Sequence, residues 1–219
     1  RDGYLVVVLC WMTASLIGAF PYYYSTFTDS FVDAFFESTS GFTTTGCTAV
    51  AEGVLSRSML LWKALSHWLG GMGILIFVLS ILPALCINGQ FIARAEAPGP
   101  VFEKMSVRLS DTPKILYITY ISMSALEFIL LVLSPKMGWF DALVNTMGSI
   151  STGGLLVHPE GVSYYDSFYV EVVISVFCIM ASINFILYNQ IRQGHILTVL
   201  RDIEVRAFLG IIAAGIAIC

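Results

Sequence analysis

The chain has 219 residues, of which 57% are hydrophobic and 12% are charged. Soluble domains carry about 25% charged residues, so this composition predicts an all-α polytopic membrane protein. The net charge of −4 says little about function, because the placement of charges matters more than their sum in membrane proteins. The scattered basic residues exclude a nucleic-acid-binding surface, and the five cysteines show no CxxC spacing of a metal or redox site.

Apolar segments follow one another along the chain. The first four are long enough to span a bilayer, whereas the last stops after about a dozen residues, which is too short. The five segments cover residues 4–24, 59–86, 115–133, 168–188 and 207–219. Because the first residue is Arg1 and the last apolar segment is short, we expect the chain to be a fragment of a longer protein.

The connections between these segments differ in character. Residues 25–58 contain a short, moderately apolar piece followed by a Thr- and Gly-rich stretch, Glu37–Cys47, and residues 134–167 have the same organisation. Neither connection can hold a full span and its loops, so each is predicted to be a short re-entrant helix with an extended return. Backbone that is not helical is tolerated at this depth only if it is buried in protein or lines a water-filled path.

The two connections also match as an internal repeat. An offset of 108 residues places Asp33-Ala34 on Asp141-Ala142, and Gly46 on Gly154. Ser40 falls on Gly148 at the same offset. Repeats of helix, loop and helix are a common plan of transporters and channels.

The tips of the two loops are candidate cation-binding residues. Backbone carbonyls can replace the water shell of a cation, glycine permits the backbone angles that aim successive carbonyls one way, and hydroxyls add oxygen ligands. The candidates are Thr43, Thr44, Thr45, Gly46, Ser151, Thr152, Gly153 and Gly154. The alternative is a pair of ordinary extracellular Gly/Ser/Thr turns, and it is weakened because both loops occur at one offset.

Polar residues in the short helices are expected to support these loops. Asp33 and Asp141 are predicted to be N-caps that accept hydrogen bonds from the free N–H groups at each helix start. The C-terminal, negative end of each pore helix would then point to the membrane centre and favour a cation there. Glu37 and Asn145 fall at matched positions, where a hydrogen bond to the loop is the favoured role.

Charge placement predicts the orientation. Basic residues gather in the connections 87–114 and 189–206, whereas 25–58 and 134–167 carry mainly acidic residues. The positive-inside rule places the basic connections in the cytoplasm and the re-entrant loops outside.

A few other residues invite a role. The string Gly70–Gly73 is predicted to let a helix pack closely against a neighbouring helix or a pore loop, and a gating hinge is the alternative. Glu127 lies inside an apolar span and is expected to pair with Lys63 or His67, because an unpaired charge there is costly. Exposure at the membrane interface or direct ion handling are the alternatives. His158 is expected to be an ordinary loop residue.

Several strings resemble one family, the TrkH-type potassium transporters of the Trk/Ktr/HKT superfamily. Phe35–Gly46 is similar to its first pore loop, and His67–Pro83 is similar to the helix that follows. Phe140–Ala142 and Ser149–Leu155 resemble the second pore loop, and Leu200–Arg206 resembles the cytoplasmic start of the third repeat.

The resemblance implies four helix–pore loop–helix repeats around a pseudo-fourfold pore, of which this chain holds two and the start of a third. It implies K⁺ uptake, with Na⁺ passed by some members, by a homodimer in the lipid of the bacterial inner membrane. A cytosolic, nucleotide-binding TrkA-type regulator is the implied partner, and no cofactor besides the transported K⁺. The implied boundaries are a first repeat at 1–86, a linker at 87–114, a second repeat at 115–190, a linker at 191–206 and a third repeat from 207–219.

Gly46 and Gly154 correspond by position to the filter glycines of that family. Two departures from the family pattern concern packing: Leu155 stands where an aromatic residue commonly follows the second glycine, and Met180–Phe185 replaces a more Gly-rich string.

Rival functions fit less well. A tetrameric two-span K⁺ channel needs identical loops, and these two differ. A membrane-embedded enzyme needs facing Asp pairs or a His/Glu metal set within the spans, and Glu127 is the clear carboxylate there. A purely structural membrane subunit would tolerate changes at Gly154 without loss of transport.

Overall fold

The computed structural model describes residues 2–25, 28–49, 55–73, 112–192, 194, 199 and 201–218. Within these ranges the secondary structure is helical and contains no strand, as predicted. The chain forms two compact units, Arg1–Ser182 and Ile183–Cys219. The candidate loops both belong to the first unit.

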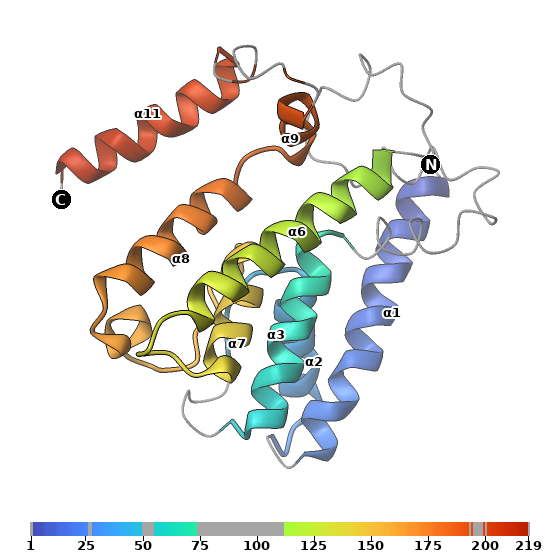
Figure 1. Ribbon diagram of the computed structural model, residues 1–219. Coiled ribbons are helices and arrows are strands. Elements are labelled where there is room, and N and C mark those ends of the chain that lie inside the picture. The colour runs from blue at the N-terminus through green and yellow to red at the C-terminus, as the bar shows by residue number, and fades with distance from the viewer. Residues whose placement is uncertain are drawn as a thin grey trace. The chain divides into compact units, whose positions relative to one another are not determined.

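Two 12-residue helices each follow a long helix in the first unit (Figure 1). Its helices are α1 (Asp2–Tyr24), α2 (Phe31–Phe42), α3 (Arg57–Gly71), α6 (Thr112–Val132), α7 (Trp139–Ile150), the 3₁₀ helix η3 (Gly161–Tyr165) and α8 (Phe168–Ala181). The short helix α2 packs against α1 and α3, and the short helix α7 packs against α3, α6 and α8. Helix α3 therefore contacts both short helices.

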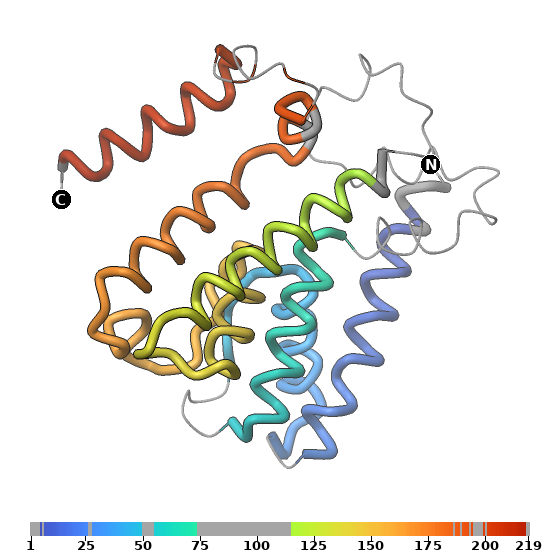
Figure 2. Tube along the Cα trace, viewed as in Figure 1, coloured from blue at the N-terminus to red at the C-terminus, as the bar shows by residue number. Residues whose placement is uncertain are grey.

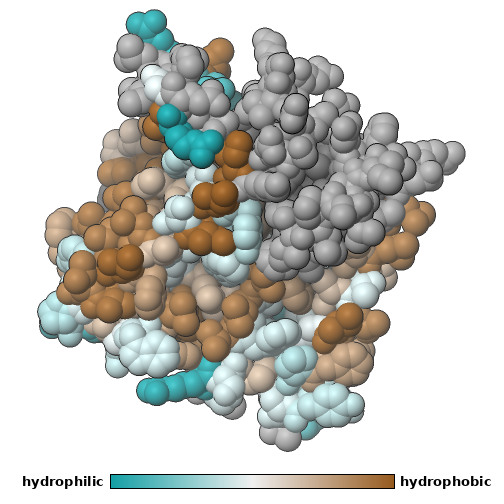
Figure 3. Space-filling view, turned by 45° about the vertical axis from the view of Figure 1, so that its right-hand side comes forward, coloured by the Kyte–Doolittle hydropathy of each residue, from teal (hydrophilic) through white to brown (hydrophobic). Residues whose placement is uncertain are grey.

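Two helices among the described residues are long and apolar enough to cross a membrane, with apolar windows at Val7–Tyr24 and Ile115–Val132. Helix α8 is apolar but shorter. Large hydrophobic side chains are exposed along all three helices, and Leu9, Ile118 and Phe168 are examples. Hydrophobic residues also form broad areas of the face seen in Figure 3. Exposed apolar surface of this extent fits contact with lipid.

Small buried residues bring α2 and α7 close to their neighbours. Ala34 of α2 is fully buried in a cluster with Ala19 and Tyr22 of α1. Val144 of α7 is fully buried against Leu60 of α3 and its neighbours. The apolar stripe of each short helix thus faces the protein and fixes the direction in which its C-terminal end points.

The predicted N-caps are wrong, because both short helices begin two residues before the aspartates. Ser30 is the N-cap of α2, and its Oγ accepts a hydrogen bond from the Asp33 N–H at 3.4 Å. Gly138 is the N-cap of α7 and makes no side-chain cap bond. Asp33 and Asp141 lie in the first turn instead. There a carboxylate still interacts favourably with the positive end of the helix dipole.

The fourth apolar segment, predicted as one span over 168–188, is interrupted. Helix α8 ends at Ala181, and α9 (Phe185–Arg192) begins after a break at Ser182–Asn184. The Ser182 hydroxyl donates to the Cys178 carbonyl at 2.8 Å, and the Asn184 carbonyl accepts from the Leu187 N–H. The Ser182 side chain thus gives a carbonyl of the last turn of α8 a second partner where the helix ends. Part of the second predicted segment, residues 74–86, lies outside the described residues.

The second unit contains α9 and α11 (Ile203–Ile218), with a small core of Leu187, Val199 and Val205. The apolar segment predicted from Ala207 is part of α11, which begins earlier. The reason is a cap, since Asp202 Oδ1 accepts a hydrogen bond from the Glu204 N–H at 2.9 Å.

Candidate ion-conducting site

The two Thr/Gly loops share one backbone conformation. Helices α2 and α7 end at Phe42 and Ile150, which the 108-residue offset relates to each other. In the first loop Thr44 and Gly46 have φ of 52° and 75°, and in the second Thr152 and Gly154 have φ of 55° and 72°. A β-branched residue at positive φ is a genuine outlier, and here it recurs at the same place in both repeats.

The same backbone hydrogen bonds close both turns. In the first loop the Thr44 N–H donates to the Gly41 carbonyl at 3.0 Å, and the Thr45 N–H donates to the Ser40 carbonyl at 2.9 Å. In the second loop the matched bonds run from Thr152 to Ser149 at 2.9 Å and from Gly153 to Gly148 at 3.1 Å. An extended strand would point successive carbonyls to opposite sides, and left-handed residues at alternate positions remove that alternation. The loops therefore have a backbone suited to presenting several carbonyls on one side, held at a strain of roughly 1–3 kcal/mol per outlier.

The two loops also touch each other. A Cβ atom added to Gly46 would collide with the carbonyl oxygen of Gly153. Figure 2 traces both loops into the same region of the first unit. Of the predicted site residues, Ser151 and Gly153 are buried and Thr44 is half-buried, and the others are exposed: Thr43, Thr45, Gly46, Thr152 and Gly154. The structure thus brings the predicted set together, with most of its members on an open surface.

The C-terminal end of α3 lies against the points where both loops begin. A Cβ atom on Gly70 would collide with the Phe42 carbonyl, at the end of α2. A Cβ atom on Gly71 would lie 2.8 Å from the Cα of Ser151, at the start of the second loop. Glycines at both positions let one helix contact both repeats closely. These contacts agree with the packing role predicted for the Gly70–Gly73 string.

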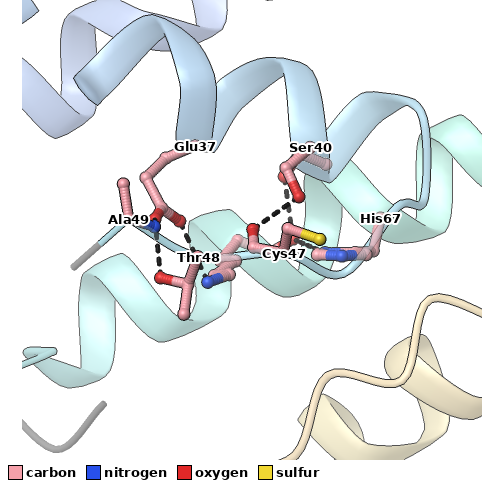
Figure 4. Close-up of polar contacts among 8 residues, drawn as sticks. Glu37, Ser40, Cys47, Thr48, Ala49 and His67 are labelled. Atoms are coloured by element: carbon pink, nitrogen blue, oxygen red, sulfur yellow. Dashed lines mark hydrogen bonds and ion pairs between the residues drawn. The ribbon is translucent and has the colours of Figure 1, made fainter. Parts of the chain in front are cut away.

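Glu37 anchors the first loop to the helices behind it (Figure 4). The carboxylate is fully buried, and its Oε1 accepts from the Thr48 hydroxyl and the Ala49 N–H, both at 2.6 Å. Its Oε2 accepts from Nζ of Lys63 at 3.0 Å, and Lys63 is itself a buried residue. Glu37 thus has the loop-supporting contacts predicted for it. The Lys63 partner was not foreseen.

Ser40 in the first repeat and Gly148 at the matched position in the second hold the returning chain in different ways. In the first loop the Ser40 hydroxyl donates to the Cys47 carbonyl at 2.6 Å (Figure 4). In the second loop Gly148 occupies the matched position, and a Cβ atom there would collide with the Leu155 carbonyl. The returning chain therefore packs on the bare helix backbone in the second repeat, where the first repeat uses a hydroxyl.

In the second repeat, polar side chains join α7 to His158 and to η3, and Asn145 bonds η3 instead of the loop predicted for it. Asp141 Oδ2 accepts from the Tyr165 hydroxyl at 3.2 Å and lies 3.3 Å from Nε2 of His158. Asn145 Nδ2 donates to the same tyrosine oxygen at 2.9 Å. Burial raises the pKa of the Tyr165 hydroxyl, against the opposing effect of the Asn145 bond, so it keeps the proton that it donates to Asp141. His158 is more than the ordinary loop residue that was predicted, since its ring also stacks on that of Tyr164, with 3.6 Å between the ring centroids.

The whole chain matches known cation transporters. The family model for TrkH, described as cation transport protein, matches residues 1–218. The chain belongs to the TrkH family. It is 36% identical over 222 residues to the Trk system potassium uptake protein TrkG of Escherichia coli K12, covering 100% of this chain and 45% of that protein. The Trk system potassium uptake protein TrkH of the same organism is 35% identical, and 46% of its length is covered.

A solved structure gives the same result. The crystal structure of the potassium transporter TrkH from Vibrio parahaemolyticus matches with a TM-score of 0.79 and 31% identity, over 100% of this chain and 44% of that one. The predicted all-α, multi-pass membrane fold and the predicted family are therefore confirmed. The chain spans about half the length of the TrkH-family relatives it matches.

The partner predicted for Glu127 is wrong in this TrkH-family chain. Glu127, on α6, is fully buried, and its Oε1 accepts from the Ser149 hydroxyl of α7 at 2.6 Å. Lys63 pairs with Glu37 instead. The sequence shows which residues are polar and apolar, but which of them meet depends on how the helices are rotated against each other.

This contact leads to a prediction for Glu127. The variant Glu127→Gln keeps an oxygen that can accept the Ser149 bond, and we expect it to unfold at nearly the wild-type temperature. Glu127→Ala leaves a cavity against α7 and should cost about 2 kcal/mol of unfolding free energy. Thermal unfolding of the purified full-length protein in detergent measures both. Equal destabilisation by the two variants would show that the carboxylate charge, rather than its shape and acceptor oxygen, is needed.

Proposed function

We propose that the protein containing this chain is a K⁺ uptake subunit whose selectivity filter includes backbone carbonyls of Thr43–Gly46 and Ser151–Gly154. The observation that carries the proposal is the pair of adjacent loops with left-handed residues at matched positions. The choice of K⁺ as the transported ion rests on the names of the relatives, which are Trk system potassium uptake proteins.

Two physical effects would favour a cation at these loops. Carbonyl oxygens can replace the hydration shell of K⁺ without any charged ligand. The C-terminal ends of α2 and α7 lie directly before Thr43 and Ser151, and the negative end of a helix dipole stabilises a nearby cation. The acidic residues Asp33 and Asp141 lie at the opposite, N-terminal ends. No covalent chemistry is part of this function.

The remaining organisation follows from the resemblance and from charge placement, and it is part of the proposal. The repeats would extend over 1–86 and 115–190, joined by cytoplasmic linkers at 87–114 and 191–206, with a third repeat starting at 207–219. The re-entrant loops would face outside, and two further loops would complete the filter. The full protein would act as a homodimer in the bacterial inner membrane with a cytosolic TrkA-type regulator.

Gly154→Ser in the full-length protein tests the filter. Gly154 has φ of 72°, which a serine adopts only with strain, so the loop should shift and the preference for K⁺ over Na⁺ should fall. Uptake of radioactive Rb⁺, competed by K⁺ or Na⁺, measures this in cells without their own K⁺ uptake. Gly138→Ser is the control, because Gly138 has φ of −70° and open space around an added Cβ. A Gly154→Ser protein with unchanged uptake and unchanged ion preference would contradict the filter assignment.

A further inference from the structure

A histidine lies behind the point where the two pore loops meet. His67 belongs to α3 and is fully buried. Its Nδ1 lies 3.0 Å from the carbonyl oxygen of Lys63, one helical turn earlier. Because a carbonyl only accepts, Nδ1 carries a hydrogen and donates it, which fixes the ring on one side.

The other side of the ring faces the second loop. A Cβ atom added to Gly153 would collide with Cδ2 of His67 and would lie 3.2 Å from both its Cγ and its Nε2. The imidazole therefore occupies the volume that a side chain at position 153 would need. Nε2 itself is buried and has no hydrogen-bond partner among the described residues, so the ring contacts this loop through its shape.

Gly153 in turn contacts the first loop. Its carbonyl oxygen occupies the space beside Gly46, where a Cβ atom would collide with it. One ring from the first repeat thus supports the second loop at Gly153, and that residue directly meets Gly46 of the first loop. A residue that supports this contact from behind controls how far apart the two loops lie.

We infer that His67 is a positioning residue, whose ring volume sets the spacing of the two pore loops and through it the preference for K⁺ over Na⁺. The inference rests on the proposed filter. The ring touches no ion in this role, since the backbone of Gly153 lies against it. Without the ring, Gly153 is no longer held against the first loop and the carbonyl cage can adapt to ions of different size, so loss of the ring should relax ion selection more than total uptake.

A volume exchange tests the inference in the full-length protein. His67→Ala removes the ring and should lower the K⁺ to Na⁺ preference roughly tenfold, and Gly153→Ala should lower Rb⁺ uptake roughly tenfold by collision with the ring. The double variant places the new methyl group in the space that the ring vacates, so uptake should recover above that of Gly153→Ala alone. His67→Phe keeps a ring of similar size and should retain the ion preference better than His67→Ala.

Three outcomes would overturn the inference. The first is a double variant that takes up Rb⁺ no better than Gly153→Ala alone. The second is a His67→Ala protein with unchanged ion preference, and the third is a His67→Phe protein that loses preference as far as His67→Ala does. Gel filtration of the fluorescently tagged proteins shows which variants fold. If His67→Ala does not fold, the His67→Phe variant and the double variant still decide the test. Altered preference in Gly154→Ser together with unaltered preference in His67→Ala would reject this inference and leave the proposed filter standing.

Discussion

Substitution of Gly46 by alanine is expected to remove most K⁺ uptake. Gly46 has φ of 75°, a conformation that costs an L-residue roughly 1–2 kcal/mol. The added methyl group would also collide with the carbonyl oxygen of Gly153. The backbone fixes the position of the methyl carbon, and its partner is a backbone atom, so no side-chain rotation can relieve the contact and the two loops must move apart.

Uptake of radioactive Rb⁺ by the full-length protein measures this effect, and we expect a fall of roughly tenfold or more. Gly138→Ala is the matched control, because it makes the same substitution at φ of −70° with nothing within 4 Å of the new atom. The control should transport as the wild type does. Wild-type uptake by Gly46→Ala, with a normal amount of protein in the membrane, would mean that the contact between the loops does not shape the ion path.

The two Thr/Gly loops were predictable because their pattern is local. A short apolar piece followed by Thr and Gly, repeated at one offset, specifies a helix and a non-helical return wherever it occurs. The matched left-handed residues Thr44 and Thr152 bear this out at the level of the backbone. The helix starts were predicted less well, although Ser30 and Asp33 form a Ser-x-x-Asp pattern that marks a helix start and could have identified the cap. Gly138 carries no such signal.

The polar anchors were less predictable, since they join residues far apart in the chain. Lys63 and His67 are four residues apart and share one face of α3, so a sequence cannot tell which of them meets a carboxylate. The packing of α2 on α3 brings Glu37 to Lys63, and the packing of α6 on α7 brings Glu127 to Ser149. Similarly, Tyr165 reaches Asp141 only because η3 folds back over α7. Such partners depend on helix rotation, which periodicity alone does not fix.

Replacement of Lys63 by methionine is expected to be strongly destabilising. Lys63 and Glu37 form a buried ion pair at 3.0 Å, with side chains 5% and 0% exposed. Methionine fills similar space but leaves the Glu37 carboxylate buried without its counter-charge, which typically costs about 3–5 kcal/mol. The carboxylate also holds Thr48 and Ala49, so the segment that follows the proposed filter should loosen and Rb⁺ uptake should fall with stability.

A second substitution separates the charge from the shape. In the double variant Lys63→Met with Glu37→Gln, no charge is buried, and one amide oxygen can still accept from Thr48 or Ala49. Its unfolding temperature should therefore lie above that of Lys63→Met alone. If the two substitutions acted independently, their losses of stability would add and the double variant would unfold at a lower temperature. Lys136→Met is the matched control at an exposed lysine and should leave the unfolding temperature unchanged. If the double variant is no more stable than Lys63→Met, the loop is anchored by the ammonium group itself and not by neutralisation of Glu37.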